Sequence, residues 1–264
     1  MKNKYFVVVL CLILALSNIT SLSGFATSEV VASGKCGDNT TWVFYDNGEF
    51  VVSGNGSMYN WYSWQTNSMP WIAYKSQIKS VRIEEGVTII GERTFADCTN
   101  ISTLSLPNSL TIISDYAFEE CGIANLTIPN NVTHIGSYAF NGCTKLQNFV
   151  LGDNVSSIDS YAFYACSSLK NIVLNIKLEH VGDYAFAGCD SAEYIEIQEN
   201  VNLIGSEAFI SCNNLKEIKV HHNNCCFASD INGVLYDTKN NILIQYPLDN
   251  LTIPNNVTHI LNTS

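Results

Sequence analysis

A repeat of 22 to 23 residues is the feature that most constrains how this chain can fold. Six phenylalanines are separated by 23, 22, 23, 23 and 23 residues, and a cysteine follows each of them three positions later. One such unit cannot bury its own apolar residues, so neighbouring units are expected to stack into a solenoid. The repeated residues are Phe95, Phe118, Phe140, Phe163, Phe186 and Phe209, with Cys98, Cys121, Cys143, Cys166, Cys189 and Cys212.

The apolar spacing within a unit predicts the class of solenoid. In the third unit Leu126 and Ile128 are two residues apart, which places both side chains on one face of a short strand. Pro129 can end that strand because proline has no N–H to donate to a ladder. This period and spacing are typical of a leucine-rich-repeat solenoid, here mainly β with short helical turns. Val132 and Ile135 are expected to enter the core from the opposite wall, and Phe140 and Cys143 from the turn.

The repeat register divides the chain into five segments. We expect a signal peptide in 1–26, an amino-terminal cap in 27–77 and six leucine-rich repeats of 22–23 residues in 78–214. An extended seventh repeat follows in 215–247, and an incomplete eighth repeat in 248–264.

The seventh repeat is longer than the others. The decapeptide from Leu126 to Ile135 recurs unchanged from Leu251 to Ile260, 125 positions later, whereas five periods of 23 span 115. The ten extra residues include Asn232-Gly233, a strong hairpin-turn signal, so we predict a β-hairpin excursion. The last unit lacks Tyr-Ala-Phe-x-x-Cys, so we expect either a fragment or an end closed by a partner chain.

The first residues have the pattern of a secretory leader. Lys2 and Lys4 precede an apolar run over 5–16, and the small-residue stretch 24–26 follows. A membrane-spanning helix needs about 20 apolar residues, so this run is too short. Cys11 lies inside the run and is expected to leave with it. The mature chain is therefore expected to be secreted or at the extracellular cell surface, without membrane insertion.

The composition excludes two classes of protein. With 13 Lys+Arg against 24 Asp+Glu, the net charge is −11, so the clustered cations that nucleic-acid binding requires are not expected. Because 47% of the residues are hydrophobic, the chain can bury a core and is not expected to be disordered.

The segment before the repeats is rich in aromatic residues. Residues 40–53 read as a β-hairpin around Asn47-Gly48, and all four tryptophans lie between 42 and 71. Aromatic bulk of this kind can cover the open edge of a solenoid, and we favour this aromatic-rich β-hairpin cap. The alternative is a sugar-stacking platform, which would make the cap a glycan-binding module. Its residues would be Tyr59, Trp61, Tyr62, Trp64 and Trp71.

The cysteines are predicted to be core thiols. Ten cysteines less Cys11 leave nine, an odd number, so at least one is unpaired within a monomer. The six repeated cysteines are expected to pack as small hydrophobes, because stacked side chains point in parallel and suit a disulfide dihedral poorly. Cys36 is the expected exception.

No set of residues predicts chemistry. The segment His221-His222-Asn223-Asn224-Cys225-Cys226 has metal-ligand residue types, but adjacent pairs do not converge on a tetrahedral zinc ion, so no metal is expected. His134, His180 and His259 share one repeat column and are predicted to be exposed. No serine nucleophile elbow or phosphate loop is present. We therefore predict no catalytic, cofactor-binding or metal-binding residues, and no cofactor.

The repeat at 128–143, Ile-Pro-x-x-Val-Thr-x-Ile-Gly-x-Tyr-Ala-Phe-x-x-Cys, resembles the BspA-like leucine-rich-repeat surface antigens. The resemblance extends to the segments 36–39, 53–58, 70–71 and 230–236, and so spans nearly the whole mature chain. It implies a surface or secreted protein, from an anaerobic bacterium or a mucosal protist, that adheres to host proteins or other cells. The family brings no catalytic residues.

These observations together predict a noncatalytic binding protein. The outward residues of the stacked strands are expected to form a continuous uncharged or acidic face that binds an extracellular protein or a host-cell surface. Partners of an acidic face would carry basic patches, so binding is expected to weaken with salt. Glycan binding by the cap aromatics is the alternative.

Overall fold

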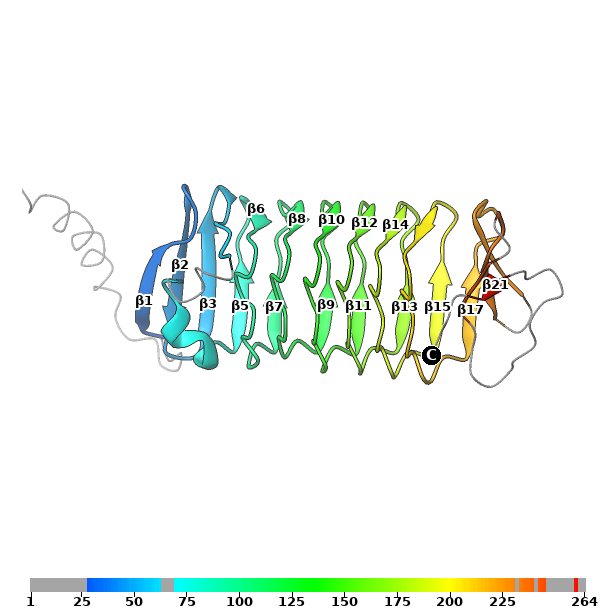
Figure 1. Cartoon of the computed structure of the whole chain (residues 1–264). Helices are drawn as coiled ribbons and strands as arrows, with labels where there is room; N and C mark the ends of the chain where they lie inside the picture. The colour runs from blue at the N-terminus through cyan, green and yellow to red at the C-terminus, as the bar shows by residue number, and fades with distance from the viewer. Residues whose placement is uncertain (1–27, 63–68, 231–232, 240–241, 246–258, 261–264) are drawn as a thin grey trace, which may run out of the picture.

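The computed structural model describes residues 28–62, 69–230, 233–239, 242–245 and 259–260. Over these residues the repeats coil into an elongated β-solenoid, and each turn adds one rung to two facing walls (Figure 1). The predicted solenoid class is confirmed. The expected signal peptide and most of the eighth repeat lie outside the described residues. No helix within the described ranges is long and apolar enough to cross a bilayer.

The first wall holds the strand that opens each repeat. Its strands run in parallel and are hydrogen-bonded in three groups, because the ladder is interrupted before the third and the fifth repeat. Its strands are β3 (Glu49–Gly54), β5 (Ser80–Ile83), β7 (Thr103–Ser105), β9 (Asn125–Thr127), β11 (Asn148–Val150), β13 (Asn171–Val173), β15 (Tyr194–Ile197) and β17 (Glu217–Val220).

The second wall is one parallel sheet of short strands. Each of its strands follows the turn that comes after a first-wall strand; in the third repeat this turn begins at Pro129. Val132 and Ile135 therefore face the core from this side, as the spacing predicts. Its strands are β4 (Gly56–Ser57), β6 (Val87–Ile90), β8 (Ile112–Ile113), β10 (His134–Ile135), β12 (Ser157–Ile158), β14 (His180–Val181) and β16 (Leu203–Ile204).

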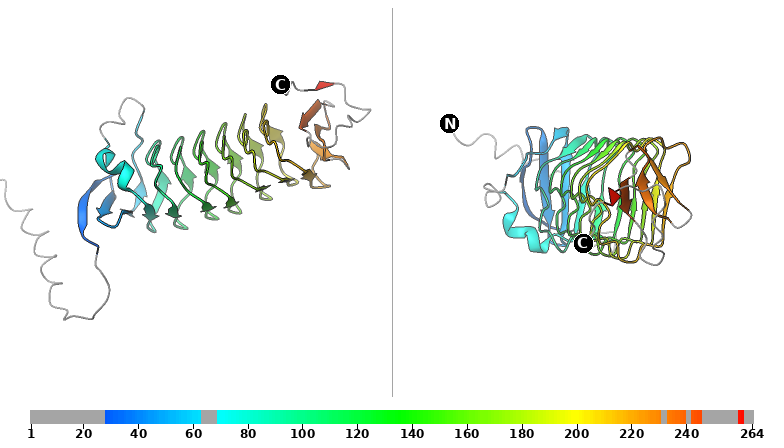
Figure 2. Two further views of the ribbon diagram at one scale, coloured as in Figure 1. Left: turned by 90° about the horizontal axis from the view of Figure 1, so that it is seen from below. Right: turned by 45° about the vertical axis from the view of Figure 1, so that its right-hand side comes forward.

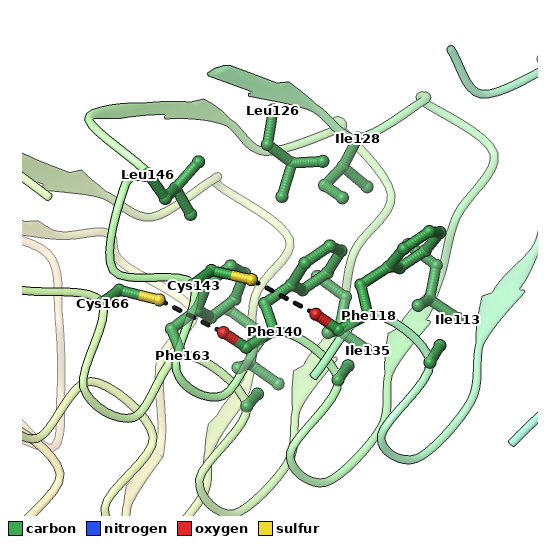
Figure 3. Packing of buried hydrophobic residues seen from close by; sticks show 14 of the residues in the cluster. Ile113, Phe118, Leu126, Ile128, Ile135, Phe140, Cys143, Leu146, Phe163 and Cys166 are labelled. Carbon is green, nitrogen blue, oxygen red and sulfur yellow. Dashed lines mark hydrogen bonds between the residues drawn. The ribbon is translucent and has the colours of Figure 1, made fainter. Parts of the chain in front are cut away.

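Equivalent side chains form buried columns along the solenoid. The ring of Phe140 stacks on Phe118 with centroids 5.4 Å apart and on Phe163 at 5.2 Å. The thiol of Cys143 donates a hydrogen bond of 3.3 Å to the carbonyl of Phe118, one turn earlier, and Cys166 donates to Phe140 in the same way (Figure 3). From the second to the sixth repeat, each repeat therefore contacts the one before it through a stacked ring and a thiol hydrogen bond.

The turn before each repeated phenylalanine contains a residue in the left-handed conformation, and in four of the six turns this residue is a tyrosine. Tyr116, Tyr138, Tyr161 and Tyr184 have φ between 55° and 61°. This conformation costs an L-residue roughly 1–2 kcal/mol. The four rings stack on one another at 4.6 to 4.9 Å, and this stacking offsets the backbone cost.

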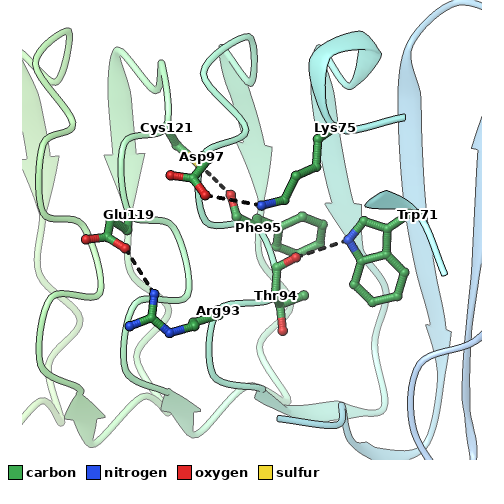
Figure 4. A network of polar contacts seen from close by, with 8 residues as sticks. All are labelled: Trp71, Lys75, Arg93, Thr94, Phe95, Asp97, Glu119 and Cys121. Carbon is green, nitrogen blue, oxygen red and sulfur yellow. Dashed lines mark hydrogen bonds and ion pairs between the residues drawn. The ribbon is translucent and has the colours of Figure 1, made fainter. Parts of the chain in front are cut away.

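The amino-terminal end continues the first wall. The antiparallel strands β1 (Val30–Lys35), β2 (Thr40–Tyr45) and β3 lead into β5, which pairs in parallel with β3. Trp71, just before the 3-10 helix η2 (Ile72–Gln77), is fully buried, and its Nε1 donates a hydrogen bond of 3.1 Å to the carbonyl of Thr94 (Figure 4). Phe50 lies 5.5 Å from Phe95, the first ring of the column. This packing favours the sealing role predicted for the aromatic segment.

The carboxyl-terminal end departs from the repeat (Figure 2). The strands β18 (Phe227–Ser229), β19 (Leu235–Asp237) and β20 (Ile242–Gln245) pair antiparallel, and β21 (His259–Ile260) joins β20 in parallel. The connection between β18 and β19 contains the predicted turn, of which residues 231–232 lie outside the described residues.

Candidate binding surface

The outward residues of the first wall form two exposed columns. In-register pairing places Asn125 beside Asn148 and Thr127 beside Val150, and the repeat continues both columns in β7 and β13. We call these eight exposed residues the central strand face. They are Thr103, Ser105, Asn125, Thr127, Asn148, Val150, Asn171 and Val173.

The central strand face is uncharged and has an apolar part on its last two strands, β11 and β13. Val150 is 60% exposed and Val173 is 47% exposed, so two β-branched side chains on neighbouring turns face solvent. Beside them the Asn148 side-chain amide donates a hydrogen bond of 3.0 Å to the Asn125 side-chain oxygen. The face therefore offers apolar contact at its carboxyl-terminal end and a hydrogen-bonded pair of amide groups beside it.

Charged residues lie at both ends of this face and largely pair with one another. Towards the amino terminus, the Nε atom of Arg82 lies 3.0 Å from a carboxylate oxygen of Glu49. Towards the carboxyl terminus, Lys216 lies 2.8 Å from Glu193, and Lys219 is paired with Glu196 in the next column. Exposed pairs of this kind contribute little stability, but they reduce the field over the central residues.

The second wall carries the histidine column. His134 and His180 are partly or fully exposed on β10 and β14, as the column predicts, whereas the side chain of His259 lies outside the described residues. The Nε2 atom of His134 lies 3.1 Å from an oxygen of Asp159, and the Ser157 hydroxyl donates a hydrogen bond of 3.0 Å to the other oxygen. The hydrogen bond between His134 and Asp159 raises the pKa of His134, against the opposing effect of the partial burial of the imidazole.

The serine, histidine and aspartate of this cluster do not form a nucleophilic triad. A nucleophile must hydrogen-bond to its base. Here Ser157 and His134 both contact one carboxylate, that of Asp159, instead of each other. A hollow of about 280 Å³ adjoins the cluster and is lined in part by His180 and Leu203. Because Ser157 does not contact His134, this cluster does not provide an activated hydroxyl to the hollow.

The structure places the cysteines differently from one part of the prediction. All six repeated cysteines are buried and free, as expected, and burial raises the pKa of Cys143 to about 12. The expectation that Cys36 is the exception is wrong: this thiol is also buried and free, and it contacts the Thr40 hydroxyl at 3.5 Å. Among the described cysteines, Cys225 is the exposed one. The repeat period identified the six buried thiols, but it carried no information about Cys36, which lies before the repeats.

The His/Cys segment at 221–226 does not assemble a metal site in the described part of the chain, where no three His, Cys, Asp or Glu side chains converge as ligands. The rings of His221 and His222 lie 4.5 Å apart, and the two adjacent thiols of Cys225 and Cys226 lie 3.5 Å apart.

The aromatic residues proposed as a sugar platform are divided between core and surface. Trp71 is buried, whereas Tyr59 is 41% and Tyr62 is 39% exposed. Trp61 is half-buried, with its ring 5.5 Å from that of Trp71. Trp64 lies outside the described residues. Among the platform residues that the structure describes, the exposed part therefore consists of the two tyrosines and part of Trp61.

The stacked tyrosines are a surface feature that sequence reasoning missed. The half-exposed column of Tyr116, Tyr138, Tyr161 and Tyr184 ends beneath the guanidinium of Arg93, which lies 3.7 Å from the centre of the Tyr116 ring. The signal was available, because these tyrosines recur with the same period as the phenylalanines.

Comparison with known proteins identifies the family. The family described as BspA type leucine rich repeat region matches residues 72–158 and 143–264, in six copies. This match covers well over half of the chain, and the chain therefore belongs to the BspA type leucine-rich repeat family. No curated protein matches the chain.

Solved structures agree on the fold. A leucine-rich repeat protein from Eubacterium ventriosum superimposes with a TM-score of 0.61 at 26% identity, over 89% of this chain and 56% of that one. The T. pallidum leucine-rich repeat protein gives a TM-score of 0.51 at 23% identity, over 66% of this chain and 86% of that one. The chain thus spans little more than half the length of the Eubacterium protein. Repeat proteins of this family are typically binding proteins without catalytic activity.

Proposed function

We propose that this chain is an exported, noncatalytic adhesion protein whose central strand face binds an extended segment of an extracellular protein or of a host-cell surface protein. The observation that carries the proposal is the pair of exposed β-branched side chains, Val150 and Val173, on the last two strands of a face without charges. Family membership supports a binding role.

The dimensions of the face suit a short extended peptide. Four strands about 4.8 Å apart give a face about 14 Å long, which corresponds to four or five extended residues at about 3.3 Å each. Such a contact is small, so its affinity depends on a few well-packed apolar residues. Val150 and Val173 are the side chains that a partner residue could cover.

A double substitution on the first wall, compared with a single control substitution on the second wall, tests this proposal. A partner that binds the double variant V150E/V173E must desolvate two carboxylates. We therefore expect the variant to bind at least tenfold more weakly than the unaltered chain to the same extracellular-matrix protein. Tenfold corresponds to about 1.4 kcal/mol, within the range of single interface residues. L203E is the matched control, because Leu203 is 53% exposed on the second wall. Binding would be measured by biolayer interferometry with purified matrix proteins.

Equal losses in V150E/V173E and L203E would contradict the use of the first wall. The salt dependence of binding separates an apolar contact from an electrostatic one. The central residues carry no charge, so any weakening with salt would come from the charged flanks, such as Glu217.

Glycan binding at the cap is the second candidate, and the exposure of Tyr59 and Tyr62 is the observation in its favour. The Tyr59 hydroxyl donates a hydrogen bond of 2.8 Å to Asp38, which fixes the ring at the surface. A glycan array probed with the unaltered chain and with Y59A/Y62A tests it: array signals that both chains share would not come from these rings.

A further inference from the structure

The connection between β17 and β18 holds two adjacent cysteines in a fixed loop. The side-chain oxygen of Asn224 accepts hydrogen bonds of 2.9 and 2.8 Å from the backbone N–H groups of Cys226 and Phe227. From the other side, the Thr238 hydroxyl contacts the carbonyls of Cys225 and Cys226 at 3.3 and 3.0 Å. The backbone on both sides of the cysteine pair is therefore held in place.

The two thiols are close to each other and one is open to solvent. Their sulfur atoms lie 3.5 Å apart, Cys225 is exposed, and Cys226 is 4% exposed. The exposed ammonium group of Lys239 lies beside the pair. Its pKa is raised, first by a hydrogen bond with Cys226 and then by the charges of the two sulfur atoms. This cation can attract a negatively charged oxidant such as oxidised glutathione to the pair.

We propose that Cys225 and Cys226 form a reversible redox modification site, a vicinal dithiol that a low-molecular-weight disulfide oxidises to a disulfide between adjacent residues. The thiolate of Cys225 attacks one sulfur of the small disulfide, whose S–S bond breaks and releases one thiol. The thiolate of Cys226 then attacks the Cys225 sulfur of the mixed disulfide and releases the second thiol. The protein loses two hydrogen atoms, and the oxidant is reduced to two thiols.

The other described cysteines are unsuited to this reaction. The repeated thiols are buried, and each from Cys121 to Cys212 contacts a carbonyl one turn earlier. Burial also raises the pKa of Cys36 to about 11 and that of Cys98 to about 12. Thiol exchange requires access and thiolate, and these sites offer neither.

The disulfide is expected to be labile. Adjacent α-carbons are about 3.8 Å apart across a trans peptide, below the usual range of about 4.4–6.8 Å for a disulfide. The bridge is consequently strained and readily reduced, as in regulatory disulfides. This geometry suits a switch better than a permanent structural link.

Mass spectrometry of the intact chain tests the proposal. The native chain would be incubated with oxidised glutathione at pH 8, alkylated with iodoacetamide, and then digested and mapped. We expect a product that has lost two hydrogen atoms, with Cys225 and Cys226 both unalkylated and free of glutathione, and we expect dithiothreitol to reverse it. In C226S the reaction should stop at a mixed disulfide between glutathione and Cys225.

Two further measurements complete the test. K239Q, which removes the neighbouring cation, should form the mixed disulfide several-fold more slowly, and K216Q, a lysine of the first wall, should react at the unaltered rate. A stable glutathione adduct on Cys225 in the unaltered chain would overturn the proposal. So would alkylation of both cysteines after treatment, or a disulfide between two chains through Cys225.

Discussion

Truncation of Phe163 to alanine tests whether the repeats stabilise one another through their stacked rings. Phe163 is completely buried, and its ring lies 5.2 Å from those of both Phe140 and Phe186. Phenylalanine-to-alanine changes in cores cost about 3–5 kcal/mol. Because two stacked pairs of about 0.5–1.5 kcal/mol each are lost as well, we expect F163A to fall at the upper end, about 4–5 kcal/mol.

Tyr161 provides a matched control two residues earlier in the same turn. Its ring is also stacked on both sides, at 4.6 Å on Tyr138 and 4.9 Å on Tyr184, but it is only half-buried. In Y161A the alanine must adopt the same left-handed conformation as Tyr161, and because it is also an L-residue the free-energy cost of that conformation is unchanged. We therefore expect Y161A to cost less than half as much as F163A. The comparison separates burial from stacking.

A double-mutant cycle tests the nearest-neighbour character of the column. F140A and F163A remove adjacent rings, so their costs should be non-additive by about 0.5–3 kcal/mol. F118A and F163A lie two turns apart, and their costs should add to within about 0.5 kcal/mol.

The free energies would be measured by urea denaturation followed by circular dichroism. A cost below about 1 kcal/mol for F163A, or equal costs for F163A and Y161A, would refute the reasoning. Removing a fully buried ring should lower the free energy of unfolding more than removing a half-exposed one. Equal coupling in the adjacent and the separated pair would refute stacking as its source.

Three further predictions follow from the contacts described above. Because His134 has a raised pKa beside Asp159, its stabilising contribution is present below about pH 6.5 and is lost as the pH rises through the folded-state value. H134Q should therefore destabilise more at pH 5.5 than at pH 8 in urea denaturation, and a loss that grows with pH would contradict the assignment. In the native chain a maleimide should modify Cys225 promptly and the buried repeat thiols only on unfolding, as followed by mass spectrometry; prompt labelling of several repeat thiols would be inconsistent with their burial. W71F should cost about 1–3 kcal/mol in the same denaturation assay, because a buried carbonyl loses its donor, and a change within about 0.3 kcal/mol would count against that hydrogen bond.

Much of the fold follows from periodicity. The spacing of Leu126, Ile128, Val132 and Ile135 places two apolar pairs on opposite walls, and all four are at most 3% exposed. The recurrence of phenylalanine and cysteine made a buried column predictable, because stacking alone allows every repeat to hide the same residues.

The candidate binding site was only partly predictable. Alternation identified the outward positions of each strand, but which exposed residues become neighbours depends on the register between turns. That register places Val150 beside Thr127 and Val173 beside Glu196, where the charged end of the wall begins. Cys36 was misjudged for a similar reason: it has no repeat partners, and its burial depends on contacts with other segments, such as the hydrogen bond that its carbonyl accepts from the Tyr59 N–H.

The sequence alone determined the solenoid, its period and the inward residues, because these depend on local spacing that each repeat copies from the last. The tertiary structure decided the contacts that join different segments: the left-handed tyrosine column, the burial of Trp71 against the first phenylalanine, and the loop that brings Lys239 beside Cys226. Such contacts depend on how distant parts of the chain meet in space, and no one-dimensional pattern records that.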